Sequence, residues 1–380
     1  MITNALLWVS NPALLYQRVA GLTVLERQLH TAAKAGLQRV WATCKAPDAA
    51  NAPRLRLPPG LEIFWIGGDI SAARAQCRPP YLVLSGAHFI QAGFIGHIAR
   101  NPGGQNAAFM DPARNTVIQV IPSKADEFTP GRQSPLPEGA SLSIPHPLEG
   151  PATMDWILSQ GHKSQDGFMA RHFDRHISLS ITRALLDTPV TPNMMTVLSC
   201  LLGLAGTACF LVHQNKAHLT GAVLVWLHSV LDGCDGELSR IRFQESPLGG
   251  DLDFWGDNIV HISLFGCLGV GFARADKSLL PLVGGAIAML GIMGSAVLVH
   301  RQRLARRRIP DEPGGSVTAL ARLETALEQR DFIYLLPVLA YFGHIYEFLW
   351  AGTVGAILFF VMMLYIGRAN REQTFQTSST

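Results

Sequence analysis

The stretch that organises this chain is residues 232–257, DGCDGELSRIRFQESPLGGDLDFWGD, which lies between apolar segments. Two aspartate pairs stand out in it. Asp232 and Asp235 are three residues apart and Asp253 and Asp257 are four apart, so each pair lies along one face of a helix. Residues 245–250, ESPLGG, are typical of a turn that folds the two helices back on each other. Four converging carboxylates near a membrane repel one another, which predicts a site for Mg²⁺ or Mn²⁺.

The same stretch resembles the signature of the CDP-alcohol phosphotransferase family, D-x2-D-G-x2-A-R-x8-G-x3-D-x3-D. Here it reads Asp232-x2-Asp235-Gly236-x2-Ser239-Arg240-x8-Gly249-x3-Asp253-x3-Asp257, and only Ser239, in place of Ala, departs from it. The resemblance implies a membrane enzyme that transfers the phospho-alcohol group of a CDP-alcohol to a hydroxyl acceptor and releases CMP.

The resemblance also implies a role for each motif residue. Asp232, Asp235 and Asp253 become ligands of two Mg²⁺ or Mn²⁺ ions. Asp257 becomes the base that takes the acceptor's proton and a fourth contact to the metal. The implied substrate-binding residues are Asn193, Thr196, Gly236, Ser239, Arg240 and Gly249, the first two from a Thr191-Pro-Asn-x2-Thr196 stretch that recurs in the family. The implied partners are a CDP-alcohol donor, an alcohol or phospho-alcohol acceptor, membrane lipid and a second copy in a homodimer.

Two features near the motif each allow two interpretations. His261 lies one turn beyond Asp257, where it either assists that carboxylate or packs as a membrane-helix histidine, the commoner role. The basic run Arg301–Arg308 either binds an anionic acceptor, through Arg307 and Arg308, or sets topology and contacts lipid headgroups.

The composition agrees with a membrane enzyme. Charged residues are 16% of the 380 residues, against about 25% in soluble proteins, and the mean hydropathy is +0.21. The six cysteines have no CxxC spacing, which argues against a disulfide framework. A net charge of +3 without an aromatic-plus-basic motif argues against nucleic acid as a partner. The N-terminus lacks the basic segment of a signal peptide.

Residues 1–125 predict a soluble α/β domain with a mostly parallel sheet. Strands are expected at residues 5–9, 39–43, 61–66, 81–85 and 116–121, and a helix at 23–35. Residues 20–37 resemble the first helix of sugar-nucleotide nucleotidyltransferases. Two departures suggest lost catalysis: Ser10-Asn-Pro12 replaces their glycine-rich phosphate loop, and Ala87 replaces their metal-binding Asp. We expect a domain that keeps this fold without its chemistry.

Prolines are frequent between residues 122 and 151 and predict a stiff linker, which we assign to residues 126–165. The membrane domain is expected at 166–372. Residues 166–186 predict a helix lying in the membrane interface, with a soluble core helix as the alternative. Its apolar side chains recur every four residues, at Met169, Phe173, Ile177, Ile181 and Leu185.

Six transmembrane helices are expected between residues 192 and 368. They are 194–212, 217 into the first aspartate pair, 254–273, 278–299, 332–346 and 348–367. Thr191 caps the first of these helices ahead of Pro192. Basic residues gather at the end of the helices that carries the motif, which predicts that both termini and the aspartates face the cytoplasm.

The sequence thus predicts an α-helical membrane protein preceded by a Rossmann-like α/β domain, acting in phospholipid or phosphoinositol-type synthesis. CDP-diacylglycerol and a CDP-polyol both fit as donors, and the fused domain favours phosphoinositol-type chemistry by analogy alone. Three alternatives stay open. They are a bifunctional enzyme whose first domain makes the CDP-alcohol, an Asp-rich membrane prenyltransferase, and a non-catalytic scaffold.

Overall fold

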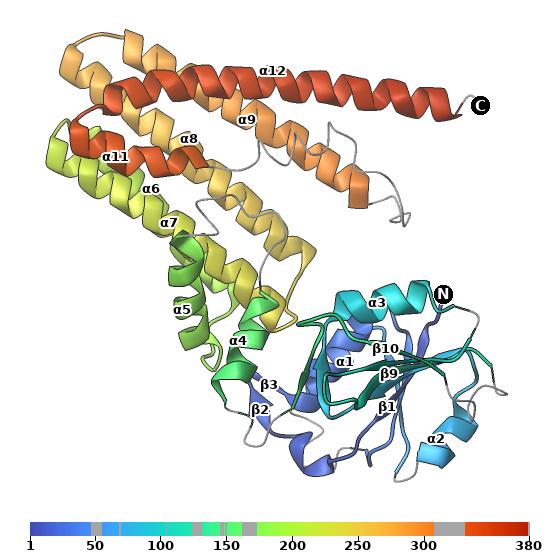
Figure 1. The fold of residues 1–380 in the computed structure, drawn as a ribbon. Helices are drawn as coiled ribbons and strands as arrows, with labels where there is room; N and C mark the ends of the chain where they lie inside the picture. The colour runs from blue at the N-terminus through green and yellow to red at the C-terminus, as the bar shows by residue number, and fades with distance from the viewer. Residues whose placement is uncertain are drawn as a thin grey trace. The chain divides into compact units, whose positions relative to one another are not determined.

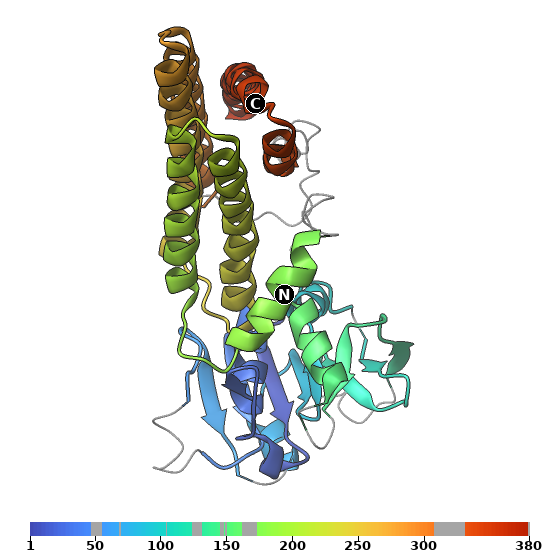
Figure 2. The same cartoon turned by 90° about the vertical axis from the view of Figure 1, so that its left-hand side faces the viewer.

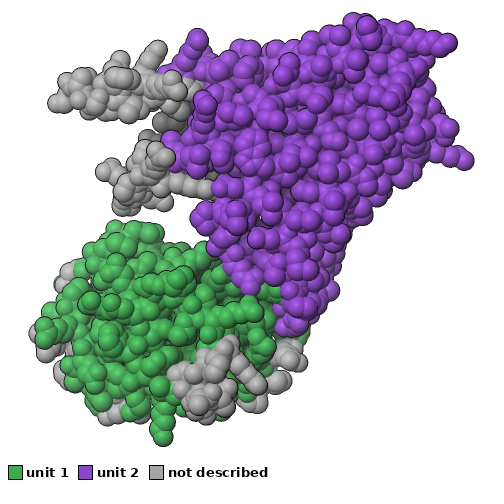
Figure 3. Space-filling view, turned by 180° about the vertical axis from the view of Figure 1, so that it is seen from behind, with its two compact units in different colours: residues 1–161, 241–243 green, residues 162–240, 244–380 purple. Residues whose placement is uncertain are grey.

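The computed structural model describes residues 1–46, 55–67, 70–103, 105–123, 131–144, 148, 150–161, 173–307 and 331–378. The chain forms two compact units, residues 1–161 with 241–243 and residues 162–240 with 244–380 (Figure 3). Each unit has its own hydrophobic core.

The first unit is an α/β fold, as predicted (Figure 1). Its elements are β1 (Asn4–Trp8), η1 (Pro12–Leu14), β2 (Arg18–Val19), β3 (Leu22–Thr23), α1 (Val24–Lys34), β4 (Arg39–Ala42), β5 (Glu62–Trp65), α2 (Ile70–Gln76), β6 (Tyr81–Ser85), β7 (His88–Ile90), α3 (Ala92–Arg100), β8 (Ala107–Met110), β9 (Thr116–Ile121), β10 (Arg132–Pro135), β11 (Ser141–Ser143) and α4 (Pro151–Ser159).

Seven strands form one sheet in the order β10-β8-β9-β6-β1-β4-β5. The pairs β1–β4, β1–β6, β4–β5 and β8–β10 are parallel, whereas β6–β9 and β8–β9 are antiparallel, which confirms a mostly parallel sheet. Alternate residues of β1 enter different cores because strand side chains alternate between faces. Ala5 and Leu7 pack with Leu25 and Leu29 of α1, and Leu6 packs with residues of α2 on the other face.

Helix α1 begins where the sequence predicted it. The Thr23 hydroxyl accepts a hydrogen bond from the backbone N–H of Glu26, and the Glu26 carboxylate accepts one from the Thr23 backbone N–H. This reciprocal pair satisfies two of the backbone donors that a helix start leaves without partners.

The predicted linker is partly structured. Strand β10 joins the sheet as an edge strand, β11 pairs with β7, and α4 follows at Pro151. An edge strand tolerates Pro135 because its outer N–H groups need no partner, and Pro151 suits the first turn of a helix. The prolines therefore mark the ends of short elements here, and the linker prediction fails for residues 132–143 and 151–159.

The second unit is helical (Figures 1 and 2). Its elements are α5 (Arg175–Leu185), α6 (Pro192–Ala208), η5 (Cys209–Leu211), α7 (Asn215–Ile241, whose last residue groups with the first unit), α8 (Pro247–Asp276), α9 (Leu280–Arg307), η6 (Asp331–Tyr334), α11 (Leu335–Phe342) and α12 (Ile345–Ser378). Helix α8 packs beside α6 and α9, and α12 packs beside α9.

Four described helical segments are long and apolar enough to cross a membrane, which indicates an integral membrane protein. They are Pro192–Leu211, Pro247–Asp276, Leu280–Ala305 and Ile345–Ile366. The sequence predicted six. Helix α7 runs into the first aspartate pair as expected, but its second half carries the polar motif, and α11 has only 8 residues. Residues 308–330, before η6, lie outside the described part of the chain.

Helix α5 corresponds to the second half of the predicted interfacial helix, whose residues 166–172 lie outside the described residues. Its apolar stripe is turned outward, with Phe173 just before it 57% exposed and Ile177 38% exposed. Its polar residues Ser178 and Thr182 are buried instead, against α7. An outward apolar stripe is typical of a helix that contacts lipid.

The cysteines behave as packing residues. All six are free thiols. In the first unit, burial raises the pKa of the Cys44 thiol to about 11, so it stays protonated and unreactive at neutral pH.

Candidate metal and substrate site

The α7–α8 hairpin places the two aspartate pairs. Ser246 caps α8 by accepting a hydrogen bond from the Gly249 N–H at 3.0 Å, and Pro247 occupies the first turn. The helix therefore starts inside the segment predicted as a turn, because Ser followed by Pro is a strong helix-start signal. Gly249 and Gly250 become part of its first turns. The chain does reverse between the two helices as predicted, but α8 already begins at Pro247, within the segment predicted as a turn.

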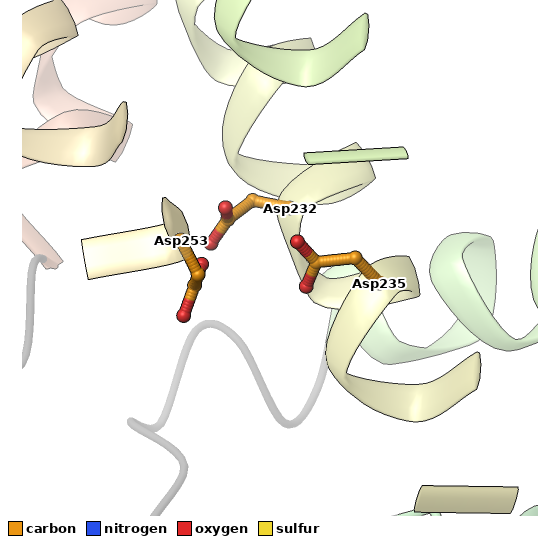
Figure 4. A group of neighbouring side chains, drawn as sticks. All are labelled: Asp232, Asp235 and Asp253. Atoms are coloured by element: carbon orange, nitrogen blue, oxygen red, sulfur yellow. The ribbon is translucent and has the colours of Figure 1, made fainter. Parts of the chain in front are cut away.

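Three carboxyl groups converge at this hairpin. Asp232 and Asp235 come from α7 and Asp253 from α8, and their carboxyl groups point toward one another (Figure 4). One oxygen of each lies within 4.8 Å of the others. Asp257 lies outside this group of three, yet interacts electrostatically with Asp232 and Asp235. Its predicted contact to the metal stays a prediction.

The three carboxyl groups fit a divalent cation. Carboxylates as close as these three repel one another unless a proton or a cation lies between them. Asp232 Oδ1 is buried without a hydrogen-bond partner among the described residues. A donor set made only of carboxylate oxygens matches the preference of Mg²⁺ and Mn²⁺.

Helix α6 contributes a hydrogen bond to this cluster. The Thr196 hydroxyl donates a hydrogen bond to Asp235 Oδ2 and contacts the Pro192 carbonyl oxygen at 3.2 Å. Thr191 caps the helix as predicted, by accepting a hydrogen bond from the Met194 N–H. Thr196 is 2% exposed, and its predicted contact to substrate stays a prediction.

The remaining predicted substrate-binding residues fall into two groups. A Cβ atom at Gly249 would lie 3.1 Å from Asn193 Oδ1, so the starts of α6 and α8 meet one turn before Asp253. At the end of α7, a Cβ atom at Gly236 would lie 2.9 Å from Arg240 Nη1. The Ser239 hydroxyl donates to the Gly236 carbonyl oxygen at 2.9 Å. Gly236 therefore leaves room for the Arg240 guanidinium.

The basic run on α9 is described only at its start. The Arg303 guanidinium lies 4.5 Å from the centre of the Phe254 ring, and Phe254 follows Asp253. This contact brings the beginning of the run close to the carboxylate cluster. The side chains of Arg306 and Arg307, and all of Arg308, lie outside the described part.

Sequence reasoning missed two buried residues beside the motif. His228, on α7, has its Nε2 atom 3.5 Å from Asp257 Oδ1. Glu237, between Asp235 and Arg240, is fully buried and accepts hydrogen bonds from three α5 side chains. His228 could have been noticed from the sequence, because it lies one helical turn before Asp232. Nothing in the linear sequence pairs Glu237 with α5. The predicted helper His261 is buried, at 5% exposure.

Residues 189–367 match the family model of the CDP-alcohol phosphatidyltransferases, over a range that contains the whole aspartate hairpin. This segment is a CDP-alcohol phosphatidyltransferase domain. Its match begins at α6 and ends within α12, so the domain coincides with most of the helical unit.

Curated relatives carry related names. The chain is 33% identical over 174 residues to a "Bifunctional IPC transferase and DIPP synthase" of Thermococcus kodakarensis, covering 46% of this chain and 38% of the relative. The protein of that name from Rubrobacter xylanophilus is 39% identical over 137 residues, 35% of this chain and 30% of the relative. A "CDP-diacylglycerol--serine O-phosphatidyltransferase" of Mycobacterium leprae is 35% identical over 78 residues, 20% of this chain and 25% of the relative. These matches span well under half of each relative.

Among solved structures, a Mycobacterium tuberculosis phosphatidylinositol phosphate synthase (PgsA1) with CDP-DAG bound matches with a TM-score of 0.37 and 21% identity. It covers 50% of this chain and 94% of that one. The CDP-alcohol phosphatidyltransferase domain therefore rests on the family match and on the aspartate hairpin.

Proposed function

We propose that this protein transfers a phospho-alcohol group from a CDP-alcohol to a hydroxyl acceptor and releases CMP. The observation that carries the proposal is the convergence of Asp232, Asp235 and Asp253 beside Asp257, inside the matched domain. An Asp-rich prenyltransferase would not need the Gly236, Arg240 and Gly249 positions that this hairpin carries, and a scaffold would not need its carboxylates intact.

The bonds that change define what each residue does. The acceptor oxygen forms a bond to the phosphorus that carries the alcohol, and the bond from that phosphorus to the CMP oxygen breaks. Asp257 takes the proton of the acceptor hydroxyl. Asp232, Asp235 and Asp253 would hold Mg²⁺ or Mn²⁺, which stabilises charge on the phosphates. Arg240, at the end of α7, binds phosphate oxygens.

The membrane setting of this chemistry is also proposed. Six transmembrane helices, including α7 and the segment around α11, would place the aspartates at one end of the helices, with both termini in the cytoplasm. Arginines near that end support this orientation. The outward apolar stripe of α5 supports contact with lipid at the interface. A homodimer follows from the family resemblance alone.

A panel of substrates tests the transfer reaction. Purified protein would be given CDP-diacylglycerol or CDP-glycerol with Mg²⁺, and glycerol 3-phosphate, inositol phosphate or serine as acceptor. We expect acceptor-dependent CMP release with at least one pair. Release that continues unchanged in EDTA, or none with any pair, would contradict the proposed function.

Arg307 and Arg308 are proposed to hold an anionic acceptor. Replacing both with Gln is expected to raise the acceptor KM by about tenfold or more, while kcat changes less, because each lost charged hydrogen bond weakens binding by about 1.5–3 kcal/mol. Steady-state CMP release measures both constants. Arg274→Gln, on the exposed end of α8, is the matched control. An unchanged acceptor KM would leave the run with a topological role.

A second candidate function is bifunctionality, which the names of the first two relatives favour. The structure of the first unit argues against it. After β1 the chain enters the short helix η1, where the Asn11 side chain accepts a hydrogen bond from the Ala13 N–H. Pro12 has no N–H that could bind a phosphate. At Ala87, the backbone N–H donates to Ser85 Oγ. Ser85 also contacts His88 Nδ1 at 2.9 Å, and His88 Nε2 lies 3.2 Å from Asp111.

We therefore propose that the first unit makes no CDP-alcohol. The full chain, given CTP, Mg²⁺ and glycerol 3-phosphate or inositol phosphate, is expected to release no pyrophosphate above background. A nucleotidyl transfer site needs a carboxylate-held cation and phosphate donors, which Ala87 and Pro12 do not supply. CMP release by the same preparation is the control for intact protein. Robust pyrophosphate release would establish the bifunctional alternative.

A further inference from the structure

A buried histidine, His228, lies next to Asp257, the proposed base. His228 is 1% exposed and lies on α7 one turn before Asp232. Its Nε2 atom is 3.5 Å from Asp257 Oδ1, on α8. Its Nδ1 atom has no hydrogen-bond partner among the described residues. Burying a polar ring between apolar helices costs free energy. A buried histidine at this position, with its Nε2 atom directed at Asp257, is therefore a candidate for a functional role.

Packing fixes the direction of this ring. On α6, a Cβ atom at Gly203 would lie 2.9 Å from the His228 Cγ and 2.8 Å from Cγ1 of Val260. Any larger residue at 203 would displace the imidazole or the α8 side chain beside it. Three helices therefore meet at the ring, and glycine is what lets α6 approach. With the ring held on that side, Nε2 stays directed at Asp257.

We propose that His228 is a positioning residue for Asp257. In this role the imidazole donates a hydrogen bond from its Nε2 N–H to Oδ1, which fixes the plane of the carboxylate that receives the acceptor's proton. This inference rests on the proposed function. Hydrogen bonds in catalytic sites are often long before substrate binds, so 3.5 Å is compatible with a bond that shortens in the complex.

Other roles for His228 fit the structure less well. The atoms that come together as a cation site all belong to aspartates, so His228 is not among the ligands. At 1% exposure the ring has no open face to an acceptor hydroxyl, so it does not act as the base itself. A contact through Asp257 is the role that its position allows.

Three substitutions separate positioning from packing. His228→Gln keeps an amide N–H near the place of Nε2, His228→Asn holds its amide too far back, and His228→Met keeps volume without a donor. CMP release from CDP-diacylglycerol and CDP-glycerol gives kcat and KM, and Mn²⁺ titration gives metal affinity. We expect Met and Asn to lower kcat by about ten- to hundredfold with KM and Mn²⁺ affinity unchanged, and Gln to recover most of the rate.

His218 provides the matched control. It lies on the same helix, is 6% exposed and packs against Phe210 and Phe272. His218→Gln and His218→Met should share one kcat, whatever their effect on melting temperature. Equal kcat for all three His228 variants, or kcat that follows melting temperature, would overturn the inference. If the unaltered chain releases no CMP, the proposed function fails with it; if it does and every His228 variant matches it, only the inference fails.

Discussion

Replacing any one of Asp232, Asp235, Asp253 and Asp257 with asparagine is expected to lower CMP release at least about a hundredfold. Asparagine keeps the size of the side chain but removes its negative charge. In the cluster, one oxygen from each of three carboxyl groups lies within 4.8 Å of the others, so no neighbour can take over a missing ligand without moving a helix. At Asp257 the loss is that of the proton acceptor.

Metal binding distinguishes the two roles. Asp232→Asn, Asp235→Asn and Asp253→Asn should weaken Mn²⁺ binding, measured by titration of the purified protein. Asp257→Asn should keep most of that affinity if it acts as the base alone. Asp251→Asn is the matched control, because Asp251 lies on α8 two residues from Asp253 and so on another face of the helix. Full activity in any of the four motif variants would contradict the assignment.

The aspartate site could be predicted because its determinants are local. Spacings of three and four residues fix a helix face wherever the helix lies, and the motif supplied a short connection between the two faces. What the spacing could not give is the start of α8. Ser246 and Pro247 begin that helix inside the predicted turn, since a capped first turn satisfies backbone donors that a longer turn would leave open.

The partners of the motif could not be predicted, because they come from distant parts of the chain. His228 faces Asp257 only once α7 and α8 have folded together, and Glu237 meets α5 across more than fifty residues. The amphipathic pattern of α5 identified an apolar stripe correctly but did not show that the polar face would be buried. A buried carboxylate on α7 is what reverses the usual arrangement there.

In the first unit, β1, β4, β5, β6 and β9 of the large sheet were predicted, and β8 and β10 were missed. Strand β6 was placed at Tyr81–Ser85 from a continuous apolar run, whereas β10 reads Arg-Gln-Ser-Pro and has no apolar pattern. It pairs with β8 through backbone atoms at the edge of the sheet, where side chains need not be apolar.

Breaking the buried ion pair beside the motif is expected to have the largest effect on stability. Glu237 is 0% exposed and accepts hydrogen bonds from Arg175 and, at 2.7 Å each, from Ser178 and Thr182. All three donors lie on one face of α5, so one carboxylate connects that helix to α7, which also carries Asp232 and Asp235. Removing one partner of such a pair costs about 3–5 kcal/mol because the other charge stays buried.

The two partners should not be equivalent. Arg175→Met leaves a carboxylate with no exposed surface and two hydroxyl donors, so we expect the melting temperature in detergent to fall by ~10 °C. Glu237→Leu should cost less. The Arg175 side chain is 12% exposed and long enough to reach solvent, and the Ser178 and Thr182 hydroxyls can turn to carbonyl oxygens of their own helix.

The double variant Arg175→Met with Glu237→Leu tests whether the two side chains stabilise the fold as a pair. With both charges gone, α5 and α7 can pack through apolar contacts, so the double variant should melt well above the Arg175→Met single variant. Arg183→Met, on the exposed face of α5, controls for loss of a basic residue from this helix. Losses that simply add in the double variant would mean that the two side chains stabilise the fold separately. In that case Glu237 would not join α5 to the part of α7 that carries Asp232 and Asp235.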